Sequence, residues 1–145
     1  MYHSLFITKG DTTINTWANW YLIPSSRPVV VQPTMAEKYV EIPGMDGSLD
    51  LTDYLTQTPS YSDRKGTWEF YVMNGYGSWE ARRADIASYL DGSKMRVMLE
   101  DDLDNYYVGR VILKEWRSEP QFSKVVFEYH LNPYKYSMRD GKAAL

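Results

Sequence analysis

The sequence predicts a mainly β fold: a mostly antiparallel β-sandwich or barrel-like core with one α-helix packed on it. Aromatic residues make up 15% of the 145 residues, and such large, flat side chains favour strands and sheet packing. Six to eight segments have the alternating or β-branched composition of strands. Only one segment has helical periodicity, and it lies between strands. This order does not fit repeated β–α–β units.

The expected strands are bounded by turns rich in glycine, proline and aspartate. Residues 66–73 form the clearest one, because Trp, Phe, Tyr and Val are concentrated there. Residues 101–105 are expected to be a hairpin loop between two others. The complete set of expected extended segments is residues 3–8, 13–23, 38–42, 48–51, 66–73, 94–100, 106–116 and 122–131.

Residues 78–91 have the pattern of an amphipathic helix. The range begins with a serine, which is a favourable N-cap. Trp79, Ile86 and Leu90 fall on one face, because seven and four residues separate them. Gly92 follows the range, and a glycine in the left-handed conformation commonly ends helices. This segment is therefore the predicted helix.

Residues 24–43 combine strand-forming residues with four prolines. Proline fixes φ and lacks the N–H that a central strand donates, so this stretch is expected to be extended but outside the middle of a sheet. Two interpretations stay open. The stretch is either an ordinary edge hairpin or an arm that adds its unpaired backbone to the sheet of a neighbouring subunit.

Composition argues against several classes of function. The absence of cysteine rules out a disulfide framework and a thiolate site, and it fits synthesis in a reducing cytoplasm. The net charge is −3, with scattered basic residues, which argues against sequence-specific DNA binding. The N-terminus lacks the pattern of a signal peptide. No apolar run approaches the roughly 20 residues that span a bilayer.

No segment predicts catalysis or a metal site, and no cofactor is expected. The acidic run Glu100–Asp104 lacks the glycine and the closing glutamate of a calcium loop. His3 and His130 each lie in a predicted strand, without a second ligand at metal spacing. Residues 74–78 precede the helix as an anion-binding turn would, but they have neither dinucleotide nor P-loop spacing.

The aromatic residues leave two interpretations. They could form a platform on which sugars stack, or they could fill the core. The core is the better explanation, and surplus Tyr and Trp on the surface are then expected at subunit contacts. The residues expected in the core are Trp68, Phe70, Trp116, Phe127 and Tyr129.

Several motifs, taken in order, resemble the N-terminal domain of the distal tail proteins of siphophages, and together they cover most of residues 1–136. Residues 42–52 (IPGMDGSLDLT) resemble the family's hairpin "PGrdG-LDLT", 61–70 its strand "-Y--R---f-f", 89–94 (YLDGSK) its "yLhGk", 99–110 its "l-dDpd-YY-GRv", and 132–136 (NPYKY) its final "-PyKy".

The resemblance implies a β core with a helix and a projecting hairpin, the belt, and a structural role without enzymatic activity. Family members form a hexameric ring with a central channel. The ring joins the tail tube and the tape measure protein to the tail-associated hub protein, and so to the receptor-binding apparatus. The implied location is the tail tip of the virion. The implied partners are copies of the same chain and these tail proteins, with DNA only in transit and no membrane.

On this resemblance, residues 24–43 are the belt, whose valines would bury against the next subunit in a ring-closing contact. The domain is expected to span residues 1–136. Residues 137–145 are expected to be a frayed tail or the start of a second, carbohydrate-binding-like domain that many relatives have. The expected interface residues are Arg27, Val29, Val30, Val31, Met35 and Tyr39.

Two other functions compete with this one. A carbohydrate-binding β-sandwich module would present several exposed, coplanar aromatic rings in a groove. A small hydrolase would hold convergent titratable groups in a pocket.

Overall fold

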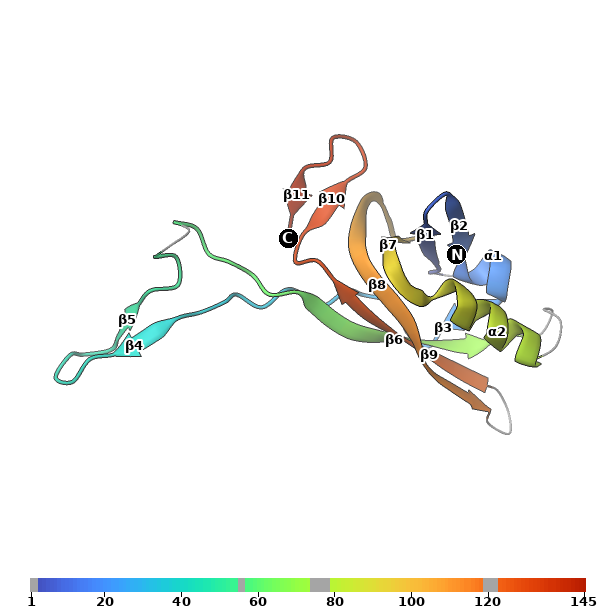
Figure 1. The fold of residues 1–145 in the computed structure, drawn as a ribbon, viewed down its shortest axis with the longest axis horizontal. Helices are drawn as coiled ribbons and strands as arrows, with labels where there is room; N and C mark the ends of the chain where they lie inside the picture. Colours follow the sequence, from blue (N-terminus) through green and yellow to red (C-terminus); the bar gives the residue numbers. More distant parts are fainter. Residues whose placement is uncertain (1–2, 55–56, 74–78, 119–122) are drawn as a thin grey trace.

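The computed structural model describes residues 3–54, 57–73, 79–118 and 123–145. Its main element is an antiparallel sheet with strand order β2-β1-β7-β8-β9-β6-β3, which curls into a half-barrel (Figure 1). The predicted barrel-like antiparallel fold is therefore confirmed. The strands of this path are β1 Leu5–Lys9, β2 Thr12–Asn15, β3 Leu22–Pro24, β6 Arg64–Val72, β7 Asp91–Leu99, β8 Asp102–Ser118 and β9 Ser123–Leu131.

The long strand β8 pairs with β7 on one side and with β9 on the other. Its register with β9 shifts between Leu113 and Glu115, and a bulge of this kind bends a strand and increases its twist. Gly109 of β8 lies opposite Leu131 of β9. A Cβ atom at this position would lie 2.6 Å from the Cα of Leu131, so only glycine allows the close approach.

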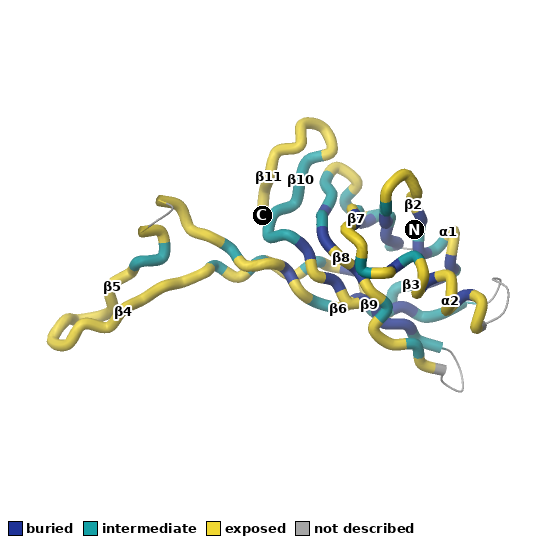
Figure 2. The backbone as a smooth tube through the Cα atoms, viewed as in Figure 1, coloured by how far each residue is buried: buried dark blue, intermediate teal, exposed yellow. Residues whose placement is uncertain are grey.

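Buried residues recur along the strands of the main sheet (Figure 2), and their side chains form one core. The rings of Phe70 and Phe127 are fully buried, with centres 5.0 Å apart. Trp68 and Tyr129 are buried as well, and the half-buried Trp116 packs against the core. The aromatic residues predicted for the core are therefore found there, which removes them from any sugar-binding platform.

The predicted helix is confirmed as α2, Trp79–Tyr89. It packs through Ile86 and Leu90, which are almost completely buried. The predicted N-cap, Ser78, lies outside the described residues. The predicted helix end is wrong: Gly92 has a positive φ of 88°, but it lies in β7 and not directly after the helix.

A second helix, α1 (Thr16–Trp20), occupies part of the segment that was predicted to be extended from residue 13 to 23. The carboxamide oxygen of Asn15 accepts hydrogen bonds from the N–H groups of Trp17 and Ala18, both at 2.9 Å. This N-cap starts a helical turn despite the strand-forming residues. The ring of Trp20 then packs edge-on against Phe127, with centres 6.1 Å apart.

The chain does not fray directly after β9. Strands β10 (Lys135–Ser137) and β11 (Ala143–Ala144) form a small hairpin, and Tyr136 of β10 pairs with Tyr106 of β8. The predicted 101–105 loop is also shorter than expected, since β8 begins at Asp102. The domain boundary near residue 136 stays a prediction. No helix in the described part of the chain is long and apolar enough to cross a membrane.

Candidate assembly surface

Residues 25–63, here called the arm, connect β3 to β6, and their described part from residue 34 to 62 projects from the body as a long antiparallel ribbon (Figures 1 and 2). Near the body, the N–H of Ala36 donates to the carbonyl of Ser60 at 2.8 Å. Farther out, β4 (Tyr39–Glu41) pairs with β5 (Ser48–Asp50) in a separate two-stranded sheet. A projecting hairpin is therefore present, as predicted, but its bounds differ: residues 24–43, predicted to be the belt, form only the outgoing half, and the chain returns through β5 to residue 63.

The outer part of the arm has one apolar and one acidic face. Val40 lies opposite Leu49 in the register, whereas Tyr39 lies opposite Asp50. Side chains alternate between the faces of a strand, so Glu41 shares the face of Tyr39 and Asp50. The ribbon can thus offer apolar contact on one side and carboxylates on the other.

Exposed apolar side chains are concentrated on the arm. Among the described residues, twelve large apolar side chains are exposed, and six of them lie between positions 39 and 54. Single exposed apolar residues are ordinary, but a contiguous group marks a contact surface. A two-stranded hairpin alone is also only marginally stable in water. The arm is therefore well suited to being covered by another chain. The six residues are Tyr39, Val40, Ile42, Met45, Leu49 and Tyr54.

The three valines lie at the root of the arm, where its backbone is held to the body. The carbonyl of Val29 accepts a hydrogen bond from the indole N–H of Trp68 at 3.1 Å. The N–H of Val31 donates to the hydroxyl of Tyr129, also at 3.1 Å. The rings of Trp68 and Tyr129 stack on each other with centres 4.2 Å apart. Core aromatic residues thus also fix where the arm leaves the body.

Arg64, at the start of β6, is buried beside this root with a relative exposure of 1%. Its Nη1 donates to the carbonyl of Val31 at 3.1 Å, and its Nε donates to the carbonyl of Pro133 at 2.9 Å. The guanidinium lies 5.2 Å from the ring centre of Tyr107. Burial raises the pKa of the Tyr107 phenol, so this ring stays neutral beside the cation. Arg64 therefore joins the arm root to the end of β9.

One arginine–carboxylate ion pair and two histidine–carboxylate contacts flank the root. Arg27 Nε lies 3.5 Å from one carboxylate oxygen of Asp101, whose other oxygen is 2.7 Å from His3 Nδ1. Where the chain returns from the arm, His130 Nε2 lies 2.7 Å from Asp63 Oδ2. Partly exposed pairs of this kind contribute at most about 1 kcal/mol each. Their contribution to the stability of the arm root is therefore small.

The structure thus divides the predicted interface residues into two groups. Arg27 and the valines lie at the root, where Val30 is half-buried against the core and the side chains of Val29 and Val31 are exposed. Met35 and Tyr39 lie on the ribbon, and Met35 forms an isolated bridge with Tyr61. Contact with a neighbouring subunit stays a prediction for all six.

Sequence reasoning missed the anchoring roles of Arg64, Trp68 and Tyr129. The available signal was strand alternation. Arg64 shares the inward face of β6 with Trp68 and Phe70, because the intervals between them, four residues and then two, are both even. An arginine in register with core aromatic residues indicates a buried guanidinium that needs carbonyl partners.

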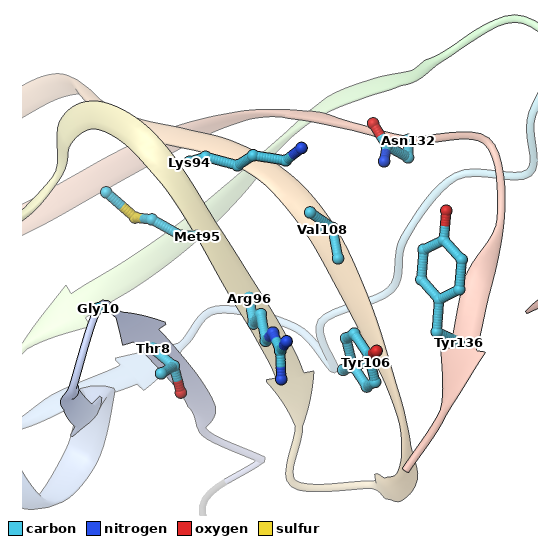
Figure 3. A pocket seen from close by; sticks show the side chains of 9 residues that line it. All are labelled: Thr8, Gly10, Lys94, Met95, Arg96, Tyr106, Val108, Asn132 and Tyr136. Atoms are coloured by element: carbon cyan, nitrogen blue, oxygen red, sulfur yellow. The ribbon is translucent and has the colours of Figure 1, made fainter. Parts of the chain in front are cut away.

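A second surface feature is a groove of about 670 Å³ on the outer face of the sheet (Figure 3). Arg96 lies over the ring of Tyr106, with 4.9 Å between the guanidinium and the ring centre. The ring of Tyr136 lies 5.6 Å from that of Tyr106. Two cationic side chains and no carboxylate line the groove, so it suits an anionic and partly apolar ligand. Its lining residues are Thr8, Gly10, Lys94, Met95, Arg96, Tyr106, Val108, Asn132 and Tyr136.

Comparison with known proteins finds a likeness of fold. No family model and no curated protein matches the chain. Among solved structures, it is similar to the SPP1 Dit (gp 19.1) protein, described as a paradigm of the hub adsorption apparatus in phages that infect Gram-positive bacteria. The fold resembles that of a phage hub protein. The TM-score is 0.58 at 18% identity, over 92% of this chain and 52% of that one, so the chain spans about half the length of Dit.

The chemistry gathered on these surfaces is that of binding. Within the described ranges, no three His, Cys, Asp or Glu side chains gather as they would around a metal ion. The arm offers apolar side chains, carboxylates and unpaired backbone, whereas the groove offers cations and aromatic rings.

Proposed function

We propose that the chain is a structural subunit of a phage tail-tip hub, in which copies assemble into a hexameric ring. The likeness of fold to SPP1 Dit supports the hub role. The resemblance of its motifs to distal tail proteins points to the same role.

The length of the arm is the main support for ring formation. From Thr34 to the turn at Gly44, the ribbon runs for about ten residues, so it reaches roughly 33 Å at about 3.3 Å per residue. A compact body of about 100 residues has a radius of gyration of only about 13 Å. The exposed apolar end of the arm therefore extends past its own body. Its contact with the body of a second copy would be head-to-tail. Such contacts close into a ring when the rotation between copies allows it.

The ring would join the tail tube and the tape measure protein on one side to the tail-associated hub protein on the other. Its place is the tail tip of the virion, after synthesis in the cytoplasm of the host bacterium. DNA would pass through the channel without specific binding, since the chain has a net charge of −3.

Native mass spectrometry of the full chain, over a range of concentrations, tests this proposal. The test variant replaces residues 37–59 by a short Gly-Asn-Gly turn, which keeps the arm root. The matched control keeps the arm and truncates one exposed body residue, Ile112→Ala. We expect a six-fold species for the full chain and the control, and a folded monomer for the shortened variant. A full chain that stays monomeric at its highest soluble concentration, or a shortened variant that still forms rings, contradicts the proposal.

A further inference from the structure

The formal charge of the chain is divided unevenly. Residues 34–62, which form the paired part of the arm, contain five acidic residues and one lysine, a charge of −4. The rest of the chain then has a charge of +1, because the total is −3. The acidic residues of the arm are Glu37, Glu41, Asp46, Asp50 and Asp53.

The groove has the opposite charge, and its cations are available. Lys94 and Arg96 enter no ion pair among the described residues. The acidic residues that flank the strands have other partners: Asp91 lies 3.0 Å from Lys9 Nζ, and Asp102 lies 3.9 Å from Lys135 Nζ. The positive charge of the groove is therefore not neutralised within the body.

The outer face of the sheet also presents apolar side chains in and beside the groove. Phe6 of β1 lies opposite Met98 of β7, and Arg96 lies opposite Val108 of β8. Phe6, Met98 and Val108 are each half-buried. A ribbon that combines apolar side chains with carboxylates fits such a surface, because each kind of group meets its complement.

We propose that this groove in one copy receives the tip of the arm, residues 41–50, of a second copy. The inference rests on the proposed ring and names the surface that receives the arm. The tip enters the groove edgewise, because its acidic and apolar side chains lie on opposite faces. Its carboxylates then pair with Lys94 and Arg96, while its apolar side chains pack on Tyr106 and Val108. The arm cannot fill its own groove, because the ribbon extends away from the body that carries the groove (Figure 1). The tip residues that take part are Glu41, Ile42, Met45, Asp46 and Asp50.

Charge reversal tests the pairing. The variant K94E/R96E should raise the dissociation constant of self-association by at least about tenfold, because it turns attraction into repulsion. The matched control is K114E, which reverses an exposed lysine of β8 outside the groove and should leave the constant unchanged. Mixing K94E/R96E with a second chain that carries E41K/D46K should restore association between the two.

Cysteine cross-linking tests the position, since the chain has no native cysteine. A D46C chain mixed with an R96C chain should form a disulfide-linked dimer under mild oxidation, whereas D46C mixed with K114C should not. Equal yields for the two mixtures would overturn the inference.

The proposal that the groove receives the arm and the proposal that the chain forms a ring can be contradicted separately. If K94E/R96E assembles like the unmodified chain while the shortened arm abolishes assembly, the arm binds elsewhere and only the groove assignment is wrong. If neither change matters, or if the unmodified chain never self-associates, both proposals are wrong.

Discussion

At the root of the arm, one guanidinium contacts parts of the chain that lie far apart in the sequence. Arg64 bonds to the carbonyls of Val31 and Pro133 and lies against the ring of Tyr107. A buried cation is costly unless hydrogen bonds and polarisable groups replace its water. These partners replace the water around Nε and Nη1, whereas Nη2 is buried without a hydrogen-bond partner among the described residues. The two bonds tie the side chain to one arrangement of the root.

We expect Arg64→Ala to lower the free energy of unfolding by about 3 kcal/mol, because it leaves two carbonyl acceptors without their donor and opens a cavity. Lys65→Ala is the matched control, since the neighbouring Lys65 is exposed and its removal should change stability by less than about 0.5 kcal/mol. Urea unfolding of both variants measures the difference. Similar losses for the two variants would show that Arg64 is not an anchor.

Strand alternation predicts the inward position of Arg64, but not its partners. Tyr107 and Pro133 reach it through the pairing of β6 with β9 and of β9 with β8, and Val31 reaches it because the arm root is bonded to Trp68 and Tyr129. The same holds for Tyr129, whose hydroxyl meets the N–H of Val31 across 98 positions of sequence. The type of residue determines which kinds of partner a buried side chain requires. The fold determines which groups provide them.

At the scale of elements, the arm differs from every strand of the main sheet. Strands β4 and β5 pair only with each other, and all six of their residues are exposed. Such a ribbon has few contacts to oppose local opening.

Backbone amides of the arm, residues 38–51, should therefore exchange rapidly with solvent in the dilute monomer and slowly after assembly. Amides of β9 should be protected in both states, because that strand lies between β6 and β8. Hydrogen–deuterium exchange read by mass spectrometry measures both segments in one experiment. Equal protection of the arm and β9 in the monomer would show that the isolated arm is not marginally stable.

Element type was predictable where composition and periodicity agreed, as in β6 and α2. It was not predictable for residues 16–20, where Trp17 and Trp20 favour a strand but the side chain of Asn15 caps a helical turn. The hairpin of β10 and β11 was missed for a different reason. Its short strands are held by pairing with β8, which no local pattern reveals.

At the scale of the whole molecule, the uneven charge implies that assembly depends on salt. Screening shortens the Debye length from about 10 Å at 0.1 M to about 3 Å at 1 M salt, so the attraction between arm and groove should weaken. We expect the dissociation constant to rise with salt, and to rise less in the K94E/R96E variant than in the unmodified chain. Analytical ultracentrifugation at several salt concentrations measures this dependence. Equal salt dependence in both would contradict a charged contact.

The groove shows the limit of sequence reasoning at this scale. Its walls come from β1, β7, β8 and β10, which bring together residues between positions 8 and 136. Nothing in the local sequence around Lys94, Arg96 or Tyr136 indicates that they are neighbours. The arm, by contrast, lies within one continuous stretch, and its prolines predicted an extended segment outside the sheet, although the returning half after residue 43 was not assigned to it.

Strands β3 and β6 pair directly where the arm departs, with Pro24 opposite Phe70. In topological terms, the arm is the enlarged loop of an ordinary hairpin whose two ends are already fixed. Inserting or deleting matched residues on its two sides would change its span in steps of about 3.3 Å without altering any strand of the half-barrel. In the proposed ring, the length of this single connection would thus set the diameter.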